Sequence, residues 1–279
     1  MTNIFSQRII GETACGHNGK IKLLKKLINI ASQCSIKTIK FQIFDVRERA
    51  IPGTKEWSIF SKLELKDKEW KSAINHARNK KLNIVADVYG DKSFSLALNL
   101  KVDAFKVHAE DFFNSYFITK VIKSKKPVLI SVGGTYRSEI FDLITWLHKK
   151  KLLNRNVYLV PGIQVFPTPI NIHYVGEILD LKKKYSKFGV KIAYADHISG
   201  DDPFSEVFPF AALGAGAEFI EKHFTDSRKL KRIDYHSALD IYQLKSFVNN
   251  LNKLVPILNY QNKFTPEELK YRKMFKKIP

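Results

Sequence analysis

The stretch that decides the fold is Thr38-Ile39-Lys40-Phe41-Gln42-Ile43, a short run rich in β-branched and aromatic residues. Short apolar runs of this kind recur along the chain with helical stretches between them, which is typical of βαβ units. Their continuous hydrophobicity indicates parallel strands that are buried on both faces. The eight expected strands are residues 8–11, 37–43, 82–87, 103–107, 127–132, 157–163, 190–195 and 217–221. Eight strands bracketed by helices predict a closed (β/α)8 barrel, the TIM barrel of the α/β class.

The stretches between these runs have the spacing of amphipathic helices. In residues 21–34, Leu24, Leu27 and Ile28 recur on one face while lysines occupy the other. We also expect helices over residues 66–80, 138–150 and 240–254. A chain of 279 residues has room for one such barrel, which we place at residues 1–257 as a single domain. Residues 258–279 are expected to form a basic, helical tail with a helix start near Thr265.

The charge balance is strongly basic, since 47 Lys+Arg against 27 Asp+Glu give a net charge of +20. Such a charge attracts anions, for example nucleic acid or phosphorylated metabolites. The lysines are spread over many segments, however, which is typical of solvated helix faces rather than of one nucleic-acid-binding stripe. We therefore expect no specific nucleic-acid partner.

The two cysteines, Cys15 and Cys34, form no CxxC pair and predict neither a disulfide framework nor a thiolate zinc site. Residues 1–8 lack the apolar run of a signal peptide, and no segment reaches about 18 consecutive apolar residues. We expect a globular protein of the cytoplasm without a membrane partner.

A barrel of this type carries its active site at the carboxyl ends of its strands, so polar residues there are the candidates. In chain order these residues are Glu12, Lys40, Gln42, Asp87, Lys106, His108, Ser131, Gln164, Asp196, His197, Glu221 and His223. His236 is a further candidate near the mouth. A lysine within an apolar strand needs a reason, because an unpaired buried ammonium is costly. Lys40 and Lys106 therefore either bind a substrate or pair with neighbouring carboxylates.

His197 and His223 follow neighbouring strands of the expected barrel. Two imidazoles at adjacent strand ends can share a divalent cation, with water, a substrate oxygen or a carboxylate completing the shell. The alternative is that each histidine is structural. Their occurrence on neighbouring strands favours the metal site.

Read in order, the strand-end residues resemble the sialic acid synthase family, whose barrel enzymes condense phosphoenolpyruvate with N-acetylmannosamine or related sugars. The resemblance extends over roughly residues 8–255 of the chain. Its motifs are Glu12…His17-Asn18-Gly19, Ile39-Lys40-Phe41-Gln42, Ile51-Pro52-Gly53, Phe105-Lys106, Phe166-Pro167-Thr168-Pro169, Asp196-His197, Glu221-Lys222-His223-Phe224-Thr225 and Asp234 followed by His236-Ser237.

The resemblance implies a transferase that joins a pyruvyl unit to an aldose, giving a nonulosonic or related 3-deoxy-ulosonic acid for surface polysaccharide. It implies Mn²⁺, or Mg²⁺, on His197 and His223, where the ion polarises the aldehyde of the sugar. It also implies a homodimer. Lysines suit a trianionic substrate because they form charge-assisted hydrogen bonds.

The resemblance further assigns roles to the strand-end residues. Phosphoenolpyruvate would be bound by Lys40, Lys106 and Ser131, and the sugar by Glu12, Gln42 and Asp234. We expect the catalytic residues to be Glu12, Lys40, Lys106 and Asp196, and the substrate-binding residues to be Gln42, Asp87, His108, Ser131, Gln164, Asp234 and His236.

The match is weakest where phosphoenolpyruvate is expected. Ala86-Asp87-Val88-Tyr89 stands where the family usually has Ser-Thr-Pro-Phe, so a carboxylate replaces a neutral hydroxyl donor and repels an anionic ligand unless it pairs with a lysine. At Ala109, Gln164, Phe166 and Ala195 further hydroxyl or amide donors of the family are lost or altered. The antifreeze-like domain that members commonly append is not part of the match.

Two other functions stay open. A metal-dependent carbohydrate aldolase, lyase or isomerase would keep the metal and sugar residues without using phosphoenolpyruvate, as Asp87, Ala109 and Ala195 suggest. A polyanion-binding module with a decayed site would use the basic charge alone. The retained Lys40 and His197 speak against decay.

Overall fold

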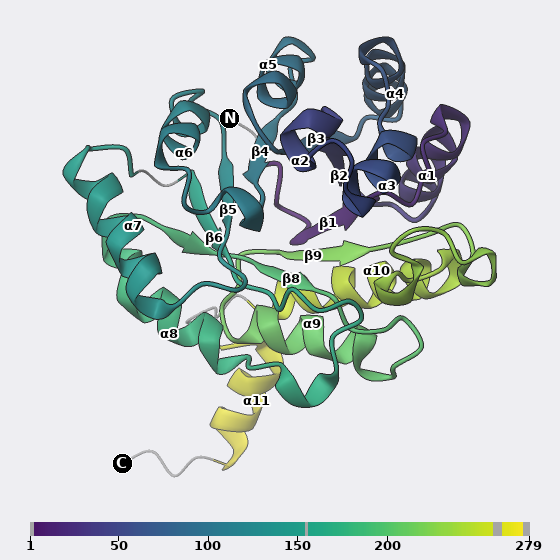
Figure 1. Cartoon of the computed structure of the whole chain (residues 1–279). Helices are drawn as coiled ribbons and strands as arrows, with labels where there is room; N and C mark the ends of the chain where they lie inside the picture. Colours follow the sequence, from purple (N-terminus) through teal and green to yellow (C-terminus); the bar gives the residue numbers. More distant parts are fainter. Residues whose placement is uncertain (1–2, 154–155, 259–263, 276–279) are drawn as a thin grey trace.

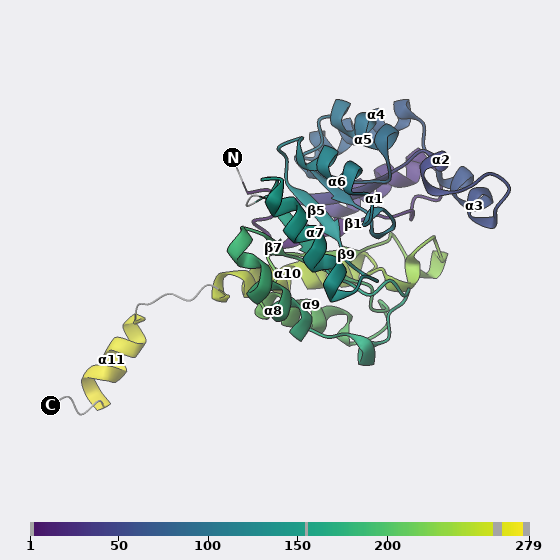
Figure 2. The ribbon, with the colours of Figure 1, turned by 60° about the vertical axis from the view of Figure 1, so that its left-hand side comes forward.

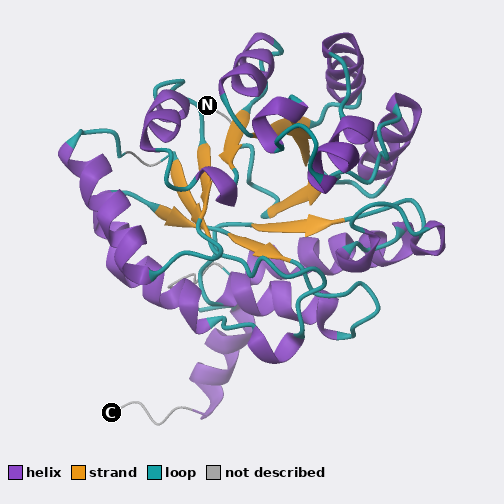
Figure 3. Cartoon of the chain, viewed as in Figure 1, coloured by secondary structure: helices purple, strands orange, loops and turns teal. Residues whose placement is uncertain are grey.

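The computed structural model describes residues 3–153, 156–258 and 264–275. Strands lie at the centre of the molecule and helices surround them (Figure 3). The strands are parallel and form one sheet in the order β7-β6-β5-β4-β3-β2-β1-β9-β8. Each strand from β1 to β6 therefore pairs with the next along the chain, and β9 returns to β1, as a barrel requires. The predicted α/β barrel is confirmed.

The strands overlap the predicted positions, with β9 beginning three residues later than expected, and there is one larger difference. They are β1 (Ile9–Glu12), β2 (Thr38–Ile43), β3 (Asn83–Val88), β4 (Ala104–Val107), β5 (Val128–Ser131), β6 (Val157–Val160), β7 (Lys191–Ile192), β8 (Tyr194–Asp196) and β9 (Ile220–His223). The difference is that the run expected at residues 190–195 is split into β7 and β8.

The split strand still occupies one position of the ring. β7 pairs with β6, and β8 pairs with β9. Beyond the split, the Ala193 N–H donates to Leu159 O at 2.9 Å and the Ala195 N–H donates to Pro161 O at 3.0 Å. These bonds join the segment to the sixth strand on one side while β8 pairs on the other, so the ring closes.

Helices follow the strands and cover the outside of the ring (Figure 1). They are α1 (Ile21–Gln33), α2 (Val46–Arg49), α3 (Lys55–Leu63), α4 (Asp67–Asn79), α5 (Asp91–Asn99), α6 (Ser115–Ile122), α7 (Arg137–Lys149), α8 (Gly176–Tyr185), α9 (Phe204–Gly214), α10 (Ile241–Ile257) and α11 (Pro266–Phe275). The four helices predicted from spacing correspond to α1, α4, α7 and α10. The short α2 and α3 lie at the end of the barrel away from the N-terminus (Figure 2).

The interior of the barrel changes from apolar to charged along the strands, because successive side chains alternate between the interior and the helix-facing layer. At the amino-terminal end Phe5 fills the interior and stacks on Phe219, with ring centroids 4.2 Å apart. In the outer layer Leu27 and Ile28 of α1 are buried, and each such side chain contributes roughly 1.5–3 kcal/mol. The charged side chains of the barrel interior described below lie towards the opposite end.

The last helix begins with a reciprocal cap. The Glu268 N–H donates to Thr265 Oγ1 at 3.2 Å, and the Thr265 N–H donates to Glu268 Oε2 at 2.8 Å. The residues of α11 are exposed, and Figure 2 shows the helix apart from the barrel. The domain boundary at residue 257 stays a prediction, since residues 259–263 and 276–279 lie outside the described part of the chain.

Candidate active site

Two lysines and three carboxylates meet inside the barrel, and we call Glu12, Lys40, Asp87, Lys106 and Glu221 the charge cluster. Lys40 Nζ lies 2.5 Å from Glu12 Oε2 and 3.1 Å from Asp87 Oδ2. It also lies 2.8 Å from Glu221 Oε1. Lys106 Nζ donates to both oxygens of Glu221, at 2.9 and 3.0 Å. All five side chains are buried, so each charge depends on its neighbours for compensation.

The register of the parallel strands brings these residues together. Glu12 at the end of β1 is aligned with Lys40 of β2. Asp87 of β3 is aligned with Lys106 of β4 in the same way. An inward position near the carboxyl end of one strand therefore faces an inward position of the next, which is why residues far apart in sequence form one cluster.

Burial and pairing act against each other on these groups. Burial lowers the pKa of Lys40, while the Asp87 and Glu221 carboxylates oppose this shift. Burial also opposes the charge of Lys106, but Glu221 and Asp87 outweigh it and raise the pKa. The two lysines hold the pKa of Glu221 well below its usual range in spite of burial. The ion pair thus favours the charged forms of Lys106 and Glu221.

His197 and His223 stand next to the cluster, with ring centroids 5.3 Å apart. His197 Nδ1 lies 2.9 Å from the Ile163 carbonyl, which can only accept, so Nδ1 carries the proton and Nε2 keeps a free lone pair. Burial lowers the pKa of His197 to about 4 and that of His223 well below its ordinary value. Both imidazoles are therefore neutral at pH 7, the form that binds metals.

His197 and His223 could serve as two protein ligands of a metal ion whose other coordination positions stay open. His223 Nδ1 is buried and has no hydrogen-bond partner in the structure. Among the described residues, however, no group of three His, Cys, Asp or Glu side chains is arranged to hold an ion. Two histidines leave the remaining coordination positions to water or substrate, as in sites where a metal acts on a substrate.

The cluster and the histidines open into one cavity of about 370 Å³ at the barrel mouth. This volume accommodates a small metabolite. Of the residues predicted for the site, those that line it are Lys40, Gln42, Asp87, Lys106, His108, Ser131, Gln164, His197, His223 and Asp234. Glu12 lies directly behind Lys40, where its Oε1 also accepts from the Ala14 N–H.

Three of the lining residues form a connected group on one side of the cavity. The Cys15 N–H donates to Asp234 Oδ2 at 3.2 Å, and the Cys15 thiol donates to Gln42 Oε1 at 3.4 Å. Burial raises the pKa of Cys15 to about 12, so the thiol is uncharged. Burial also raises the pKa of Asp234. Cys15 therefore holds Gln42 and Asp234 close to each other in the cavity wall, where both can form hydrogen bonds with a ligand.

Two predicted residues lie elsewhere. Asp196 is not among the residues that line the cavity, because it alternates to the helix-facing side of its strand and forms a buried ion pair with Lys222. The His236 side chain is exposed and stacks on Tyr235, with ring centroids 3.9 Å apart. Its backbone carbonyl accepts from the Gly200 N–H at 2.9 Å. In this structure both residues are positioned to stabilise loops and strands around the mouth.

Other cavity residues were not assigned a role from the sequence. Glu221 joins both lysines, and its position at the end of an apolar run was the available signal. Arg49 also lines the cavity, and the buried ring of Tyr89 packs against its guanidinium. No spacing rule singles out Arg49, because it ends a four-residue helix that the sequence pattern does not reveal.

The fold and this cavity define an enzyme of the (β/α)8-barrel class with its site at the carboxyl ends of the strands. The sequence profile of the NeuB family matches residues 27–263. The chain therefore belongs to the NeuB family, which confirms the resemblance to sialic acid synthases.

Named relatives agree with this assignment. The chain is 26% identical over 260 residues to an N,N'-diacetyllegionaminic acid synthase of Campylobacter jejuni, covering 88% of this chain and 75% of the relative. It is 23% identical over 283 residues to a pseudaminic acid synthase of Helicobacter pylori, covering 96% and 80%. Relatives of this kind are nonulosonic acid synthases, and the chain is a transferase of the condensing-synthase type.

Solved structures give the same fold. The crystal structure of N-acetylneuraminic acid synthetase from Leptospira borgpetersenii, in complex with citrate, is similar with a TM-score of 0.84 and 25% identity, covering 96% of this chain and 92% of that one. A truncated 3-deoxy-D-arabino-heptulosonate 7-phosphate synthase from Thermotoga maritima is similar with a TM-score of 0.68 and 17% identity, over 90% and 87%. The second likeness concerns the fold alone.

Proposed function

We propose that this chain condenses phosphoenolpyruvate with an aldose to form a nonulosonic or related 3-deoxy-ulosonic acid, assisted by a divalent metal. The observation that carries the proposal is the pair of neutral imidazoles, His197 and His223, beside two buried lysines at the mouth of a NeuB-family barrel. Such a site combines a place for a Lewis acid with cations for an anionic substrate. We propose surface polysaccharide as the destination of the product.

In the proposed reaction C3 of phosphoenolpyruvate forms a bond to the aldehyde carbon of the sugar. Water then adds to C2 and inorganic phosphate leaves, so the atoms of both substrates and one water are accounted for. Lys40, Lys106 and Ser131 bind the phosphate and carboxylate groups. The nitrogens of the two lysines are held in fixed positions by Glu221, which orients them before substrate arrives.

The metal, proposed as Mn²⁺ or Mg²⁺, would supply Lewis-acid polarisation of the aldehyde. His197 and His223 would hold it, and the bond from His197 Nδ1 to the Ile163 carbonyl orients the ring for this role. Gln42 and Asp234 would bind sugar hydroxyls. Glu12, buried at Lys40, would accept or return a proton at the sugar.

A second function is favoured by one specific observation. In the charge cluster three carboxylates face two lysines, so the lysine charges are already compensated before any anionic ligand binds. A metal-dependent aldolase, lyase or isomerase acting on a carbohydrate would need no phosphoenolpyruvate subsite. Binding of phosphoenolpyruvate in the micromolar range would argue strongly against this alternative.

Release of inorganic phosphate from phosphoenolpyruvate tests the proposal. The purified chain is incubated with Mn²⁺ and a panel of aldoses, including N-acetylmannosamine, and phosphate is measured against a no-aldose control. We expect release that requires both the aldose and the metal. No release with any aldose would overturn the condensing function.

Assembly and location are also predictions. We propose a homodimer, which sedimentation or light scattering of the purified chain would test, and a cytoplasmic location. No helix in the described residues has the length and apolar character needed to cross a membrane.

A further inference from the structure

We infer that Arg49 recognises an anionic group of the acceptor, so that the acceptor sugar is an aldose carrying a carboxylate or a phosphate. The inference rests on the proposed function and extends it to the class of acceptor. Arg49 ends α2 and lines the cavity, and its side chain is only 8% exposed.

The guanidinium of Arg49 is held in place by three aromatic rings. Its Cζ lies 3.9 Å from the ring centroid of Phe60, 4.2 Å from that of Tyr89 and 5.1 Å from that of Phe44. Cation–π contacts of this kind stabilise a buried cation and fix its plane. The rings supply no hydrogen-bond acceptor equivalent to a carboxylate, however, so the fork of N–H groups keeps its capacity to bind an anion.

Arg49 interacts with the Cys15 thiol and with Glu110, but among the described residues its donors have no buried carboxylate as acceptor. Nε and Nη1 are buried and have no hydrogen-bond partner. Among the described residues the carboxylate within ion-pair distance is that of Glu110, 3.6 Å from Nη2, and its side chain is 51% exposed. A contact of this length is too long for a hydrogen bond. A ligand carboxylate or phosphate would supply the acceptors that the protein does not.

Arg49 also differs from the two lysines in its charge surroundings. Each lysine of the charge cluster lies within 3 Å of a buried carboxylate, namely Glu221. The Tyr89 hydroxyl beside Arg49 is uncharged at neutral pH, since burial raises its pKa well above the ordinary value. Arg49 is therefore the cavity cation that has no buried carboxylate within ion-pair distance among the described residues.

The position of Arg49 favours the acceptor over phosphoenolpyruvate. Its charge acts on Cys15 and Asp234, and Cys15 binds both Gln42 and Asp234. Gln42 and Asp234 are the residues proposed to bind the sugar. An anionic group on Arg49 would thus belong to the molecule that these residues bind.

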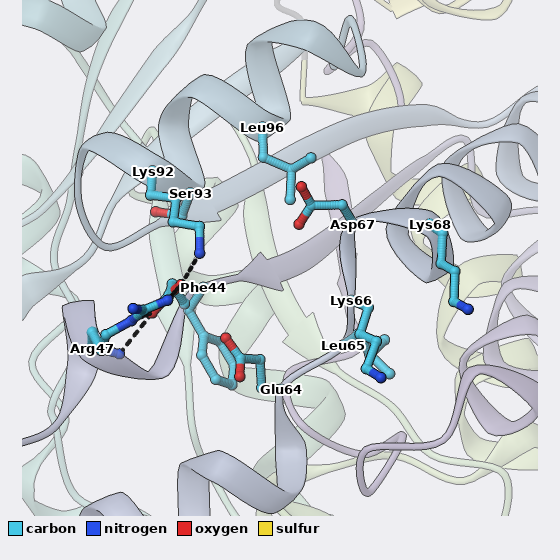
Figure 4. A pocket seen from close by; sticks show the side chains of 11 residues that line it. Phe44, Arg47, Glu64, Leu65, Lys66, Asp67, Lys68, Lys92, Ser93 and Leu96 are labelled. Carbon is cyan, nitrogen blue, oxygen red and sulfur yellow. Dashed lines mark hydrogen bonds and ion pairs between the residues drawn. The ribbon is translucent and has the colours of Figure 1, made fainter. Parts of the chain in front are cut away.

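Arg47 offers a matched control two residues away. Its side chain is 72% exposed and pairs with Asp45 at 3.0 Å. Arg47 lines a different hollow, of about 470 Å³. Figure 4 shows it there with Phe44, Glu64 and Lys92. Replacing Arg47 removes the same charge from the same short helix without touching the cavity.

The experiment measures binding, not turnover, with the purified full-length chain. Calorimetry compares D-glucose, D-glucuronate and D-glucose 6-phosphate on the wild type, Arg49→Met, Arg49→Lys and Arg47→Met. We expect the wild type to bind at least one of the two acidic sugars about tenfold or more tightly than glucose. Arg49→Met should lose this preference, Arg49→Lys should keep part of it, and Arg47→Met should keep all of it.

Several outcomes would overturn the inference. The inference is wrong if the wild type shows no preference for acidic sugars. It is also wrong if Arg49→Met keeps the preference. If Arg49→Met does not fold, Arg49→Lys decides, because it retains the charge but loses the planar fork of donors: an undiminished preference for acidic sugars in Arg49→Lys would overturn the inference. A loss of phosphoenolpyruvate affinity in the Arg49 variants as large as that for acidic sugars would assign Arg49 to phosphoenolpyruvate and also overturn it.

The inference and the proposed function fail separately. If acidic sugars bind through Arg49 but no phosphate is released from phosphoenolpyruvate, the condensing function fails while the anion-recognition role stands. If phosphate is released with neutral aldoses and Arg49→Met is fully active, the condensing function stands and the role of Arg49 fails.

Discussion

Glu221 accepts two hydrogen bonds from Lys106 Nζ inside the barrel, at 2.9 and 3.0 Å. The same carboxylate accepts from Lys40 at 2.8 Å, so one acidic side chain holds both candidate substrate-binding ammonium groups. All three side chains are buried, so the same hydrogen bonds that position the two ammonium groups also compensate their charges in the folded protein.

Removing the charge of Glu221 should therefore be strongly destabilising. We expect Glu221→Gln to lower the free energy of unfolding by about 3–5 kcal/mol, since it leaves Lys106 buried without a carboxylate partner. Urea denaturation measures the change. Glu177→Gln is the control: Glu177 pairs with Arg137 at the partly exposed surface, at 2.8 Å, and should lose no more than about 1 kcal/mol. Equal effects of the two substitutions would contradict this account.

Metal binding should depend on the paired histidines. We expect His223→Ala to weaken Mn²⁺ binding by about 100-fold or more, because one of two protein ligands is lost. Electron paramagnetic resonance of free Mn²⁺ measures the affinity. His148→Ala, an exposed position that packs on Phe188, should leave it unchanged. Unaltered Mn²⁺ affinity in His223→Ala would remove this residue from the site.

The carboxylate of Asp87 should oppose phosphoenolpyruvate. Asp87 pairs with Lys40 at 3.1 Å, and its Oδ1 is buried without a partner. We expect Asp87→Ser to tighten phosphoenolpyruvate binding by about tenfold, because a like charge is removed from beside the lysines. Calorimetry with phosphoenolpyruvate alone is the measurement, and Asp91→Asn at the surface is the control. Weaker binding of phosphoenolpyruvate to Asp87→Ser would contradict this prediction, because it would show that the carboxylate favours binding.

Stability should fall in mild acid through His17. Burial lowers the pKa of His17 to about 4, below the value of about 6.5 in an unfolded chain. Protonation therefore favours unfolding, and the stability from the neutral ring is complete above about pH 6.5 and lost as the pH falls towards 4. The loss amounts to about 1.4 kcal/mol per pH unit.

His17→Asn tests this pH dependence. The stability advantage of the wild type over the variant should shrink by roughly 3 kcal/mol between pH 7 and pH 4, as measured by urea unfolding at several pH values. A constant difference over this range would show that His17 titrates normally in the folded protein.

Much of the barrel could be predicted because its signals are local. The run at Thr38–Ile43 is apolar enough to be buried on both faces, and the spacing of Leu24, Leu27 and Ile28 defines one face of a helix. The helices between consecutive strands act as crossover connections, which makes neighbouring strands parallel and adjacent. The split at Ala193 was not predictable, since it depends on how the ring closes against β6 and β9.

The sequence by itself determined the barrel and the set of polar residues at its mouth, because strand period and strand order place their side chains at one end. It could not determine which of these residues form ion pairs with one another. Asp196 and His197 are adjacent in sequence, yet one faces the helices and pairs with Lys222 while the other faces the cavity. Only the tertiary structure decided that Glu221 joins two lysines and that Arg49 stands among three aromatic rings. The physical reason is that ion pairs and cation–π contacts act over a few ångströms between residues that are not neighbours in the sequence, Glu221 and Lys40 being 181 positions apart, and only folding sets those distances.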